Sequence, residues 1–120
     1  GLLEKRREFL RQFWLFYSRR SPLEILPHFD KTLLFQQIDW LAAFLSDALK
    51  DKLGIRENWI SQDLERGIQQ FNQKQTVLGL LKANQILQKM RSDLSLVNAV
   101  NQELILLDGL TQLITEVFEN

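Results

Sequence analysis

The chain has 120 residues, 45% of them hydrophobic and 25% charged, which is typical of one globular domain with a single core and excludes a disordered segment. Its 15 basic and 15 acidic residues give zero net charge, which argues against a dedicated nucleic-acid binder, because such domains usually carry a basic excess. The lack of cysteine excludes disulfides and thiolate metal sites and is compatible with a reducing cytoplasm.

Helical periodicity dominates the start of the chain, where apolar residues recur three and four positions apart. This spacing predicts a first helix over residues 2–18. Ser21 and Pro22 then favour a short helical turn, with serine as the N-cap and proline at the first helical position. That turn is expected over residues 23–26 and to stop at Pro27, since proline cannot continue a helix.

A third and most hydrophobic helix is predicted over residues 31–53, with Asp30 as its N-cap and Gly54 as its end. Its apolar arc is wider than a helix on the protein surface needs. We therefore expect this helix at the centre of the fold, covered on two sides. The arc comprises Leu33, Leu34, Ile38, Trp40, Leu41, Phe44, Leu45, Ala48 and Leu49.

Three more helices are predicted in the C-terminal half, over residues 60–71, 74–92 and 96–118. Asn72 or Gln73 is expected to break the first of these helices and to cap the next. The core-facing side of the last helix is expected to hold Ala99, Val100, Leu106, Leu107, Leu110, Ile114, Val117 and Phe118.

Together these elements predict an all-α fold, a single helical bundle-like domain of about five to six helices over residues 1–120. Because the connections are short, sequential helices are expected to pack mostly antiparallel. No apolar run approaches the roughly 18–20 residues needed to cross a bilayer, so we expect no membrane span. The first residues are too charged for a signal peptide. The start at Gly1 rather than at methionine suggests a fragment, a tag scar or processing, and we interpret the chain as a fragment of a larger subunit.

The sequence offers little from which to build an active site. Its single histidine, His28, is expected in a loop with no further metal ligands in register. Two carboxylate pairs, Asp47 with Asp51 and Glu116 with Glu119, are expected on polar helix faces, where solvated acids do no useful proton transfer. Nucleotide-binding and nucleophile motifs are absent. We therefore predict no catalytic residue, no metal site and no cofactor, and a chain that is not itself an enzyme.

Five basic residues support an alternative interpretation, a helical nucleic-acid-binding domain. Lys5, Arg6 and Arg7 form one cluster on the first helix, and Arg19 and Arg20 lie at its end. The placement of the two arginines also suits the helix dipole, which favours cations there. With zero net charge and no helix lined for base reading, DNA contact is the less favoured interpretation.

Apolar residues on helix faces that should be exposed to solvent are more informative than the charged clusters. Leu15, Leu78, Leu81 and Ile105 each fall among polar neighbours on their predicted helices. Leu78 and Leu81 are expected side by side, in contact either with another helix of this chain or with another subunit. Glu103 falls inside the apolar arc of the last helix and is either paired with a basic residue or solvated near the helix start. These five residues are the candidate interface residues.

Four blocks in a fixed order resemble one protein family. They are IDWLAAFLSDALKDKLG (38–54), DLERGIQQF (63–71), VLGLLKANQILQKM (77–90) and NAVNQELILLDGLTQLI (98–114). In order and spacing they resemble the C-terminal domains of the delta-prime subunits of bacterial DNA polymerase III. The opening LLEKRREFLRQ and the short SPLEIL segment fit as well, so that the resemblance covers essentially the whole chain.

The resemblance implies a collar domain of the clamp loader, a hetero-pentamer with delta and gamma or tau subunits that places the sliding clamp on DNA. It implies these subunits as partners, a bacterial cytoplasmic location, and a parent holoenzyme that is a DNA-directed DNA polymerase. The zinc module and arginine finger of the family lie in its N-terminal part and do not carry over. The alternative identity is the collar domain of a gamma, tau or delta subunit. The isolated domain is interpreted as a monomer, with self-association left open.

Overall fold

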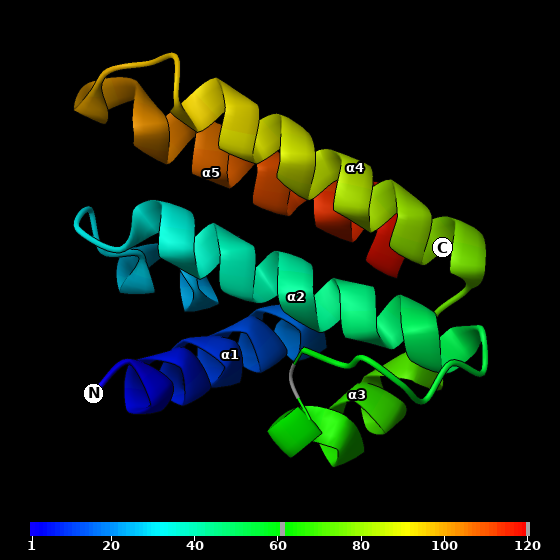
Figure 1. The fold of residues 1–120 in the computed structure, drawn as a ribbon. Helices are drawn as coiled ribbons and strands as arrows, with labels where there is room; N and C mark the ends of the chain where they lie inside the picture. The colour runs from blue at the N-terminus through cyan, green and yellow to red at the C-terminus, as the bar shows by residue number, and fades with distance from the viewer. Residues whose placement is uncertain (61, 120) are drawn as a thin grey trace.

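The structure is a computed structural model that describes residues 1–60 and 62–119. Its α-helices, shown in Figure 1, are α1 (Leu2–Arg19), α2 (Leu34–Lys52), α3 (Glu65–Asn72), α4 (Val77–Leu94) and α5 (Ala99–Leu113). The shorter elements are the 3-10 helices η1 (Pro22–Glu24), η2 (Leu26–His28) and η3 (Gln62–Leu64) and a π-helical turn, η4 (Ile114–Phe118). No strand occurs among the described residues, which confirms the all-α prediction.

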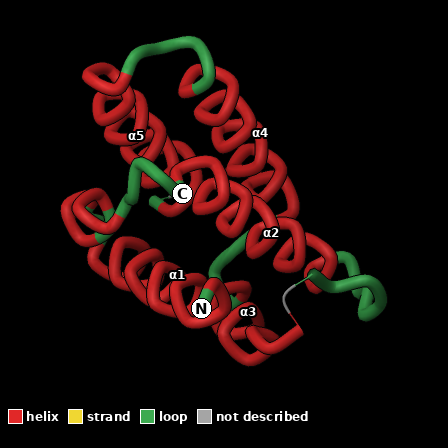
Figure 2. The backbone as a smooth tube through the Cα atoms, turned by 60° about the vertical axis from the view of Figure 1, so that its left-hand side comes forward, coloured by secondary structure: helices red, strands yellow, loops and turns green. Residues whose placement is uncertain are grey.

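Helix α2 lies at the centre of the fold. The antiparallel hairpin of α4 and α5 lies on one side of it, and α1 and α3 lie on the other (Figures 1 and 2). Helix α2 contacts α1, α3 and α4 directly, which confirms the prediction that it is covered on two sides. From the predicted arc it buries Leu34, Ile38, Trp40, Leu41, Phe44, Leu45 and Ala48.

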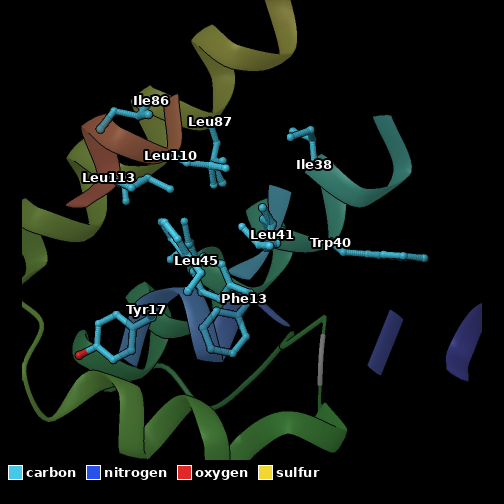
Figure 3. Close-up of a cluster of buried hydrophobic side chains, with 14 of the residues drawn as sticks. Phe13, Tyr17, Ile38, Trp40, Leu41, Leu45, Ile86, Leu87, Leu110 and Leu113 are labelled. Atoms are coloured by element: carbon cyan, nitrogen blue, oxygen red, sulfur yellow. The ribbon is translucent and has the colours of Figure 1, made fainter. Parts of the chain in front are cut away.

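A cluster of aromatic rings joins both ends of the chain to α3. Phe71 of α3 is fully buried, and its ring centroid lies 4.8 Å from that of Tyr17, 5.3 Å from Phe44 and 5.9 Å from Phe118. These edge-to-face arrangements suit the ring quadrupoles. The aliphatic part of the core, drawn in Figure 3, includes Leu41, Leu45, Leu87, Leu110 and Leu113.

The first two long helices run parallel, which departs from the expected antiparallel packing. The ring centroid of Phe9 lies 6.1 Å from Trp40, and that of Phe13 lies 5.7 Å from Phe44, so a step of four residues along α1 matches a step of four along α2. The segment of residues 20–33, which contains η1 and η2, carries the chain back along α1 before α2 begins. A connection of this length does not force neighbouring helices to be antiparallel.

The start of α2 differs from the prediction by three residues. Asp30 does not cap the helix directly; its carboxylate accepts the backbone N–H of Thr32 at 2.8 Å and closes a turn ahead of Leu34. The side chain of Gln37 holds the same segment, because it accepts the Asp30 N–H at 2.9 Å and donates to the His28 carbonyl at 3.0 Å. The predicted end at Gly54 is confirmed by its positive φ of 76°.

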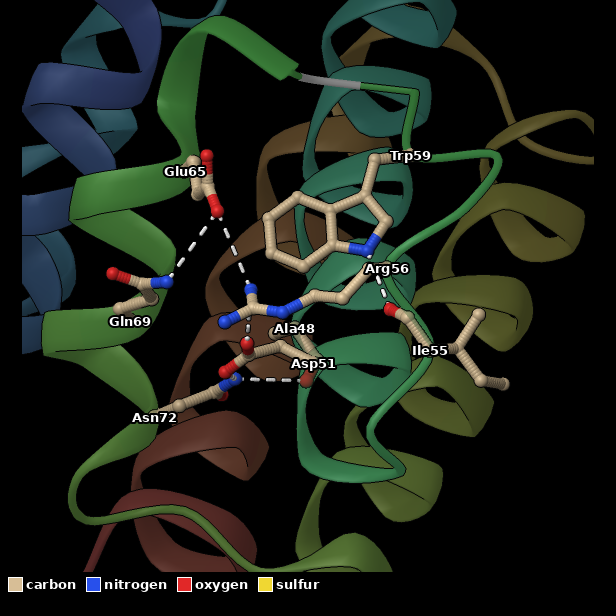
Figure 4. Close-up of polar contacts among 8 residues, drawn as sticks. All are labelled: Ala48, Asp51, Ile55, Arg56, Trp59, Glu65, Gln69 and Asn72. Atoms are coloured by element: carbon tan, nitrogen blue, oxygen red, sulfur yellow. Dashed lines mark hydrogen bonds and ion pairs between the residues drawn. The ribbon is translucent and has the colours of Figure 1, made fainter.

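The helix predicted over residues 60–71 begins only at Glu65, and Ile60 lies exposed outside it. Figure 4 shows what holds the segment before it: the guanidinium of Arg56 lies 3.1 Å from Asp51 and 3.3 Å from Glu65, and stacks over the Trp59 ring. The indole N–H of Trp59 donates to the Ile55 carbonyl at 2.8 Å and holds the loop in this conformation.

The expected cap of α4 at Asn72 or Gln73 is wrong. Thr76 is the N-cap, and its hydroxyl accepts the backbone N–H of Gly79 at 3.0 Å. Asn72 is instead buried at the end of α3, where its amide donates to the Ala48 carbonyl and to Asp51, both at 2.8 Å (Figure 4). It therefore binds α3 to α2 rather than starting a helix.

Helix α5 turns a narrower face to the core than predicted. Leu106, Leu110 and the apolar residues of η4 are buried, but Val100 is 82% and Leu107 is 39% exposed, and Ala99 is exposed as well. Gly109 faces α4, where its lack of a Cβ makes room for the Met90 side chain. The other apolar side of α5 is left in solvent.

Candidate assembly surface

His28 and the two carboxylate pairs that were considered for metal binding or proton transfer lie apart from one another. His28 is exposed in η2, and within residues 1–60 and 62–119 no three histidine, cysteine or carboxylate side chains are arranged to hold a metal ion. The prediction of a solvated Asp47 is wrong: its side chain is fully buried, and its carboxylate accepts the Ile60 N–H at 2.9 Å with Lys50 at 3.8 Å. A buried carboxylate bonded to the backbone is a structural anchor for the segment after α2.

Most of the basic residues considered for phosphate contact are engaged within the chain. Arg6 donates twice to the carboxylate of Asp63, at 2.8 and 2.9 Å, and Arg7 lies 3.5 Å from the same carboxylate. Arg19 lies 2.8 Å from Glu24. These pairs neutralise the charge that phosphate binding would use.

Arg20 also has an internal role. It takes the left-handed conformation at the end of α1, with φ of 54°, and donates to the carbonyls of Tyr17 and Phe118, the second at 2.9 Å. Its guanidinium carbon lies 4.6 Å above the Tyr17 ring and 5.8 Å above the Phe118 ring. Arg20 therefore ties the C-terminal turn to α1, and is not available to a ligand.

The pair of Arg6 and Asp63 makes stability depend on pH. Hydrogen bonding to Arg6 holds the pKa of Asp63 below its ordinary value, so the pair stabilises the fold above about pH 4 and loses this effect as acid protonates Asp63. We expect Arg6→Gln to lower the free energy of unfolding by about 1 kcal/mol at neutral pH, and by progressively less toward about pH 2. Urea denaturation at several pH values measures this, and a difference that is independent of pH would contradict it.

Arg11→Gln is the matched control for this prediction. Arg11 also lies on α1 and pairs with a carboxylate, that of Glu8 at 2.8 Å. Both residues of this pair are exposed, and they lie only one turn of helix apart. Its loss is expected to change the free energy of unfolding by less than about 0.5 kcal/mol.

Two of the candidate interface residues lie clearly in solvent. Leu78 is 79% exposed and Leu81 is 43% exposed, and their spacing of three places them one turn apart on the outer side of α4. Neither side chain belongs to the buried core that α4 forms with α2 and α5. The two together form a small apolar surface, which we call the α4 patch.

The other three candidates differ from one another. Ile105 is half-buried and packs against the core, and it lines a cavity of about 150 Å³ between α4 and α5 together with Ile86 and Met90. Leu15 is half-buried on α1. Glu103 is exposed, and it takes part in no hydrogen bond or ion pair with the described residues. The intrachain partner considered for Glu103 is therefore not found in this part of the chain.

The sequence pattern missed a second exposed apolar surface. Val100, Leu104 and Leu107 are 82%, 65% and 39% exposed and lie at positions i, i+4 and i+7 of α5, hence on one face. We call them the α5 stripe. Their spacing could have revealed the stripe, but α5 has apolar residues on most of its circumference, and periodicity alone does not say which of them are buried.

A groove with a volume of about 500 Å³ adjoins the α5 stripe. It lies between η2 with the residues after it and the first turns of α5. Its lining includes the apolar side chains of Leu26, Pro27, Phe29, Leu34, Val100 and Leu106. Lys31 lies on the η2 side of the groove and Glu103 on the α5 side. The groove and the stripe share Val100, so they form one continuous surface.

None of the helices within residues 1–60 and 62–119 combines the length and the hydropathy needed to cross a bilayer. The α4 patch, the α5 stripe and the groove are apolar features on the surface of the domain. Apolar side chains gathered in this way are typical of a surface that binds another protein.

Comparison with known proteins agrees with this arrangement. The model of the family described as "DNA polymerase III, delta subunit, C terminal" matches residues 1–115. The chain is 62% identical over 119 residues to DNA polymerase III subunit delta' of Haemophilus influenzae. The aligned region is 99% of this chain and 36% of that protein. It is also 34% identical over 91 residues to the subunit of the same name from Buchnera aphidicola, and there the aligned region is 76% of this chain and 28% of that protein.

The chain thus spans about a third of the length of the relatives that it matches. No solved structure matches it. The family match extends over all five α-helices, including both exposed apolar surfaces. The chain belongs to the family of C-terminal domains of DNA polymerase III delta subunits, and its relatives there are delta-prime subunits.

Proposed function

We propose that this domain is a non-catalytic assembly module, which joins a delta-prime subunit to the other subunits of a bacterial clamp loader. The observation that carries the proposal is the α4 patch, where Leu78 and Leu81 lie in solvent on a helix whose opposite face is fully buried. Membership of the delta-subunit family supports the same function. Ile105 and Glu103 on α5 and Leu15 on α1 are proposed as further contacts.

In this proposal the partners are the delta and gamma or tau subunits, in a hetero-pentamer that works in the bacterial cytoplasm and loads the sliding clamp for DNA synthesis. The domain contributes a rigid body. Its aromatic cluster connects α1, α2, α3 and η4, and a close-packed interior transmits force rather than absorbing it. Movement that nucleotide drives elsewhere in the complex then acts against a fixed collar.

Charge placed in the α4 patch is the direct test of the proposal. We expect the double variant Leu78→Glu with Leu81→Glu, in the full-length subunit, to weaken binding to the partner subunits by about tenfold or more, because it buries two charges in an apolar contact. Size-exclusion chromatography and titration calorimetry with purified partners measure the loss. The helicity and melting temperature of the variant should equal those of the parent, since both positions are exposed.

Gln70→Glu provides the control, because Gln70 is an exposed polar residue of α3, on the other side of α2 from the α4 patch. It adds a charge to the surface of the domain without removing an apolar contact, and is expected to leave the affinity within about twofold of the parent. Equal affinity of the α4 patch variant and this control would remove Leu78 and Leu81 from the interface.

A further inference from the structure

We propose that the groove between η2 and α5 receives an amphipathic helix of a neighbouring subunit, oriented by charges of opposite sign on the two sides of the groove. This inference rests on the proposed assembly function and adds a second contact surface to it, with a partner of stated chemistry. The partner helix carries apolar side chains on its buried face, basic residues along the edge that meets α5, and acidic residues along the edge that meets Lys31.

The shape of the groove supports a helix as the partner. Leu26, Phe29 and Leu34 form one apolar wall, and Val100 and Leu106 form the other, with a volume of about 500 Å³ between them. Beyond the groove the surface continues along the α5 stripe, whose seven-residue span covers roughly 10 Å of helix. A helix that lies in such a groove places apolar side chains at i, i+3 or i+4, and i+7, which matches the spacing of the stripe.

The charges of α5 support basic residues on one edge of that helix. Residues 99–118 contain three carboxylates and no lysine or arginine. Glu116 lies 3.6 Å from Lys82 of α4, whereas Glu103 has no hydrogen bond or ion pair with the described residues and lies at the groove. A carboxylate beside an apolar contact needs a cation once water is excluded, and a basic residue of the partner would supply it.

Lys31 supports acidic residues on the other edge. It lies on the η2 side of the same groove, and it too has no hydrogen bond or ion pair with the described residues. Two charges of opposite sign on facing sides favour one direction of the bound helix and disfavour the reverse, because the reversed helix would bring like charges together. The groove therefore selects both the chemistry and the orientation of its partner.

The first arm of the test places charge in the stripe of the full-length subunit. Val100→Glu with Leu104→Glu is expected to weaken binding to the partner subunits by about tenfold or more, measured by titration calorimetry. Asn101→Glu is the matched control, because Asn101 is an exposed polar residue on another side of α5. It should bind as the parent does. Unchanged binding of the double variant would overturn the inference.

The second arm exchanges the two charges. We expect Glu103→Lys and Lys31→Glu each to weaken binding by about tenfold, and the double exchange to weaken it further, because both edges of the partner then meet like charges. If Glu103 and Lys31 instead serve only to pair with each other, the double exchange restores the interaction and the parent affinity. That restoration would overturn the inference. Both residues are exposed, so these substitutions are expected to leave the fold of the subunit intact.

The outcomes separate this inference from the proposed function. If the α4 patch variant fails to assemble while every groove variant binds normally, the groove inference is wrong and the assembly function stands. If the groove variants bind normally but their isolated subunit loses thermal stability or becomes more sensitive to protease, another part of the same chain fills the groove, and the inference is again overturned. Weakened binding with an unchanged isolated subunit supports it.

Discussion

Replacing Phe71 by alanine is expected to lower the free energy of unfolding by about 3–5 kcal/mol, the range seen for large aromatic side chains removed from a core. Phe71 is fully buried, and its ring meets those of Phe13, Tyr17, Phe44 and Phe118. Its loss leaves a cavity where α1, α2, α3 and η4 meet. Since a domain of this size is stable by only about 5–15 kcal/mol, the variant should be close to unfolding at 37 °C.

Urea or thermal denaturation measures the effect, and Phe35→Ala is the control. Phe35 is only half-buried at the start of α2, where the Arg91 guanidinium carbon lies 5.2 Å above its ring. We expect a loss of about 1 kcal/mol there, because little apolar surface is uncovered and no central cavity forms. Equal losses at the two positions would show that the aromatic cluster is not the centre of the core.

Asp47→Ala is expected to have the second-largest effect, a loss of about 2–3 kcal/mol. The carboxylate is fully buried and accepts the Ile60 N–H at 2.9 Å, so its removal leaves an unpaired backbone group and a void beside α2. The effect should be greatest in the segment between α2 and α3. Hydrogen exchange at the Ile60 amide is therefore expected to accelerate more than exchange in α4 or α5.

Two companion variants give this prediction its control. Asp39→Ala removes a carboxylate from the same helix, but this one is exposed and pairs with Arg91 at 2.8 Å, so we expect a loss below about 1 kcal/mol. Asp47→Asn keeps an oxygen that can accept the Ile60 N–H, and should be less damaging than alanine. If Asp47→Ala were as mild as Asp39→Ala, the carboxylate would not anchor the segment.

The two exposed apolar surfaces are the features of this domain that support the proposed assembly function. The α4 patch and the α5 stripe lie on the hairpin that covers only one side of α2 (Figure 1). On the other side of α2, Arg6 of α1 is paired with Asp63 of η3, directly before α3. We infer that the hairpin is the main side that meets other subunits, whereas the α1 side contributes Leu15 alone among the candidate residues.

Much of the fold follows from the sequence. The wide apolar arc over residues 33–49 predicted that α2 lies at the centre, because a helix that is apolar on most sides has to be covered on most sides. Gly54 predicted the end of that helix, since glycine readily takes the positive φ found there. The order of four helical blocks predicted the family. An apolar arc, a glycine that ends a helix and the order of blocks are all visible in the sequence without knowledge of how the helices pack.

The tertiary structure decided the rest. Periodicity identifies the apolar residues of α5, but only the packing of α5 against α4, η1 and η2 determines that Leu106 turns inward and Val100 turns out. The burial of Asp47 depends on Ile60, thirteen positions away, and the parallel course of α1 and α2 depends on the path of residues 20–33. Such contacts are set by how the helices pack against one another. The sequence by itself therefore determined a helical domain with an apolar helix at its centre, and the packing decided which of its other apolar faces remain exposed to solvent.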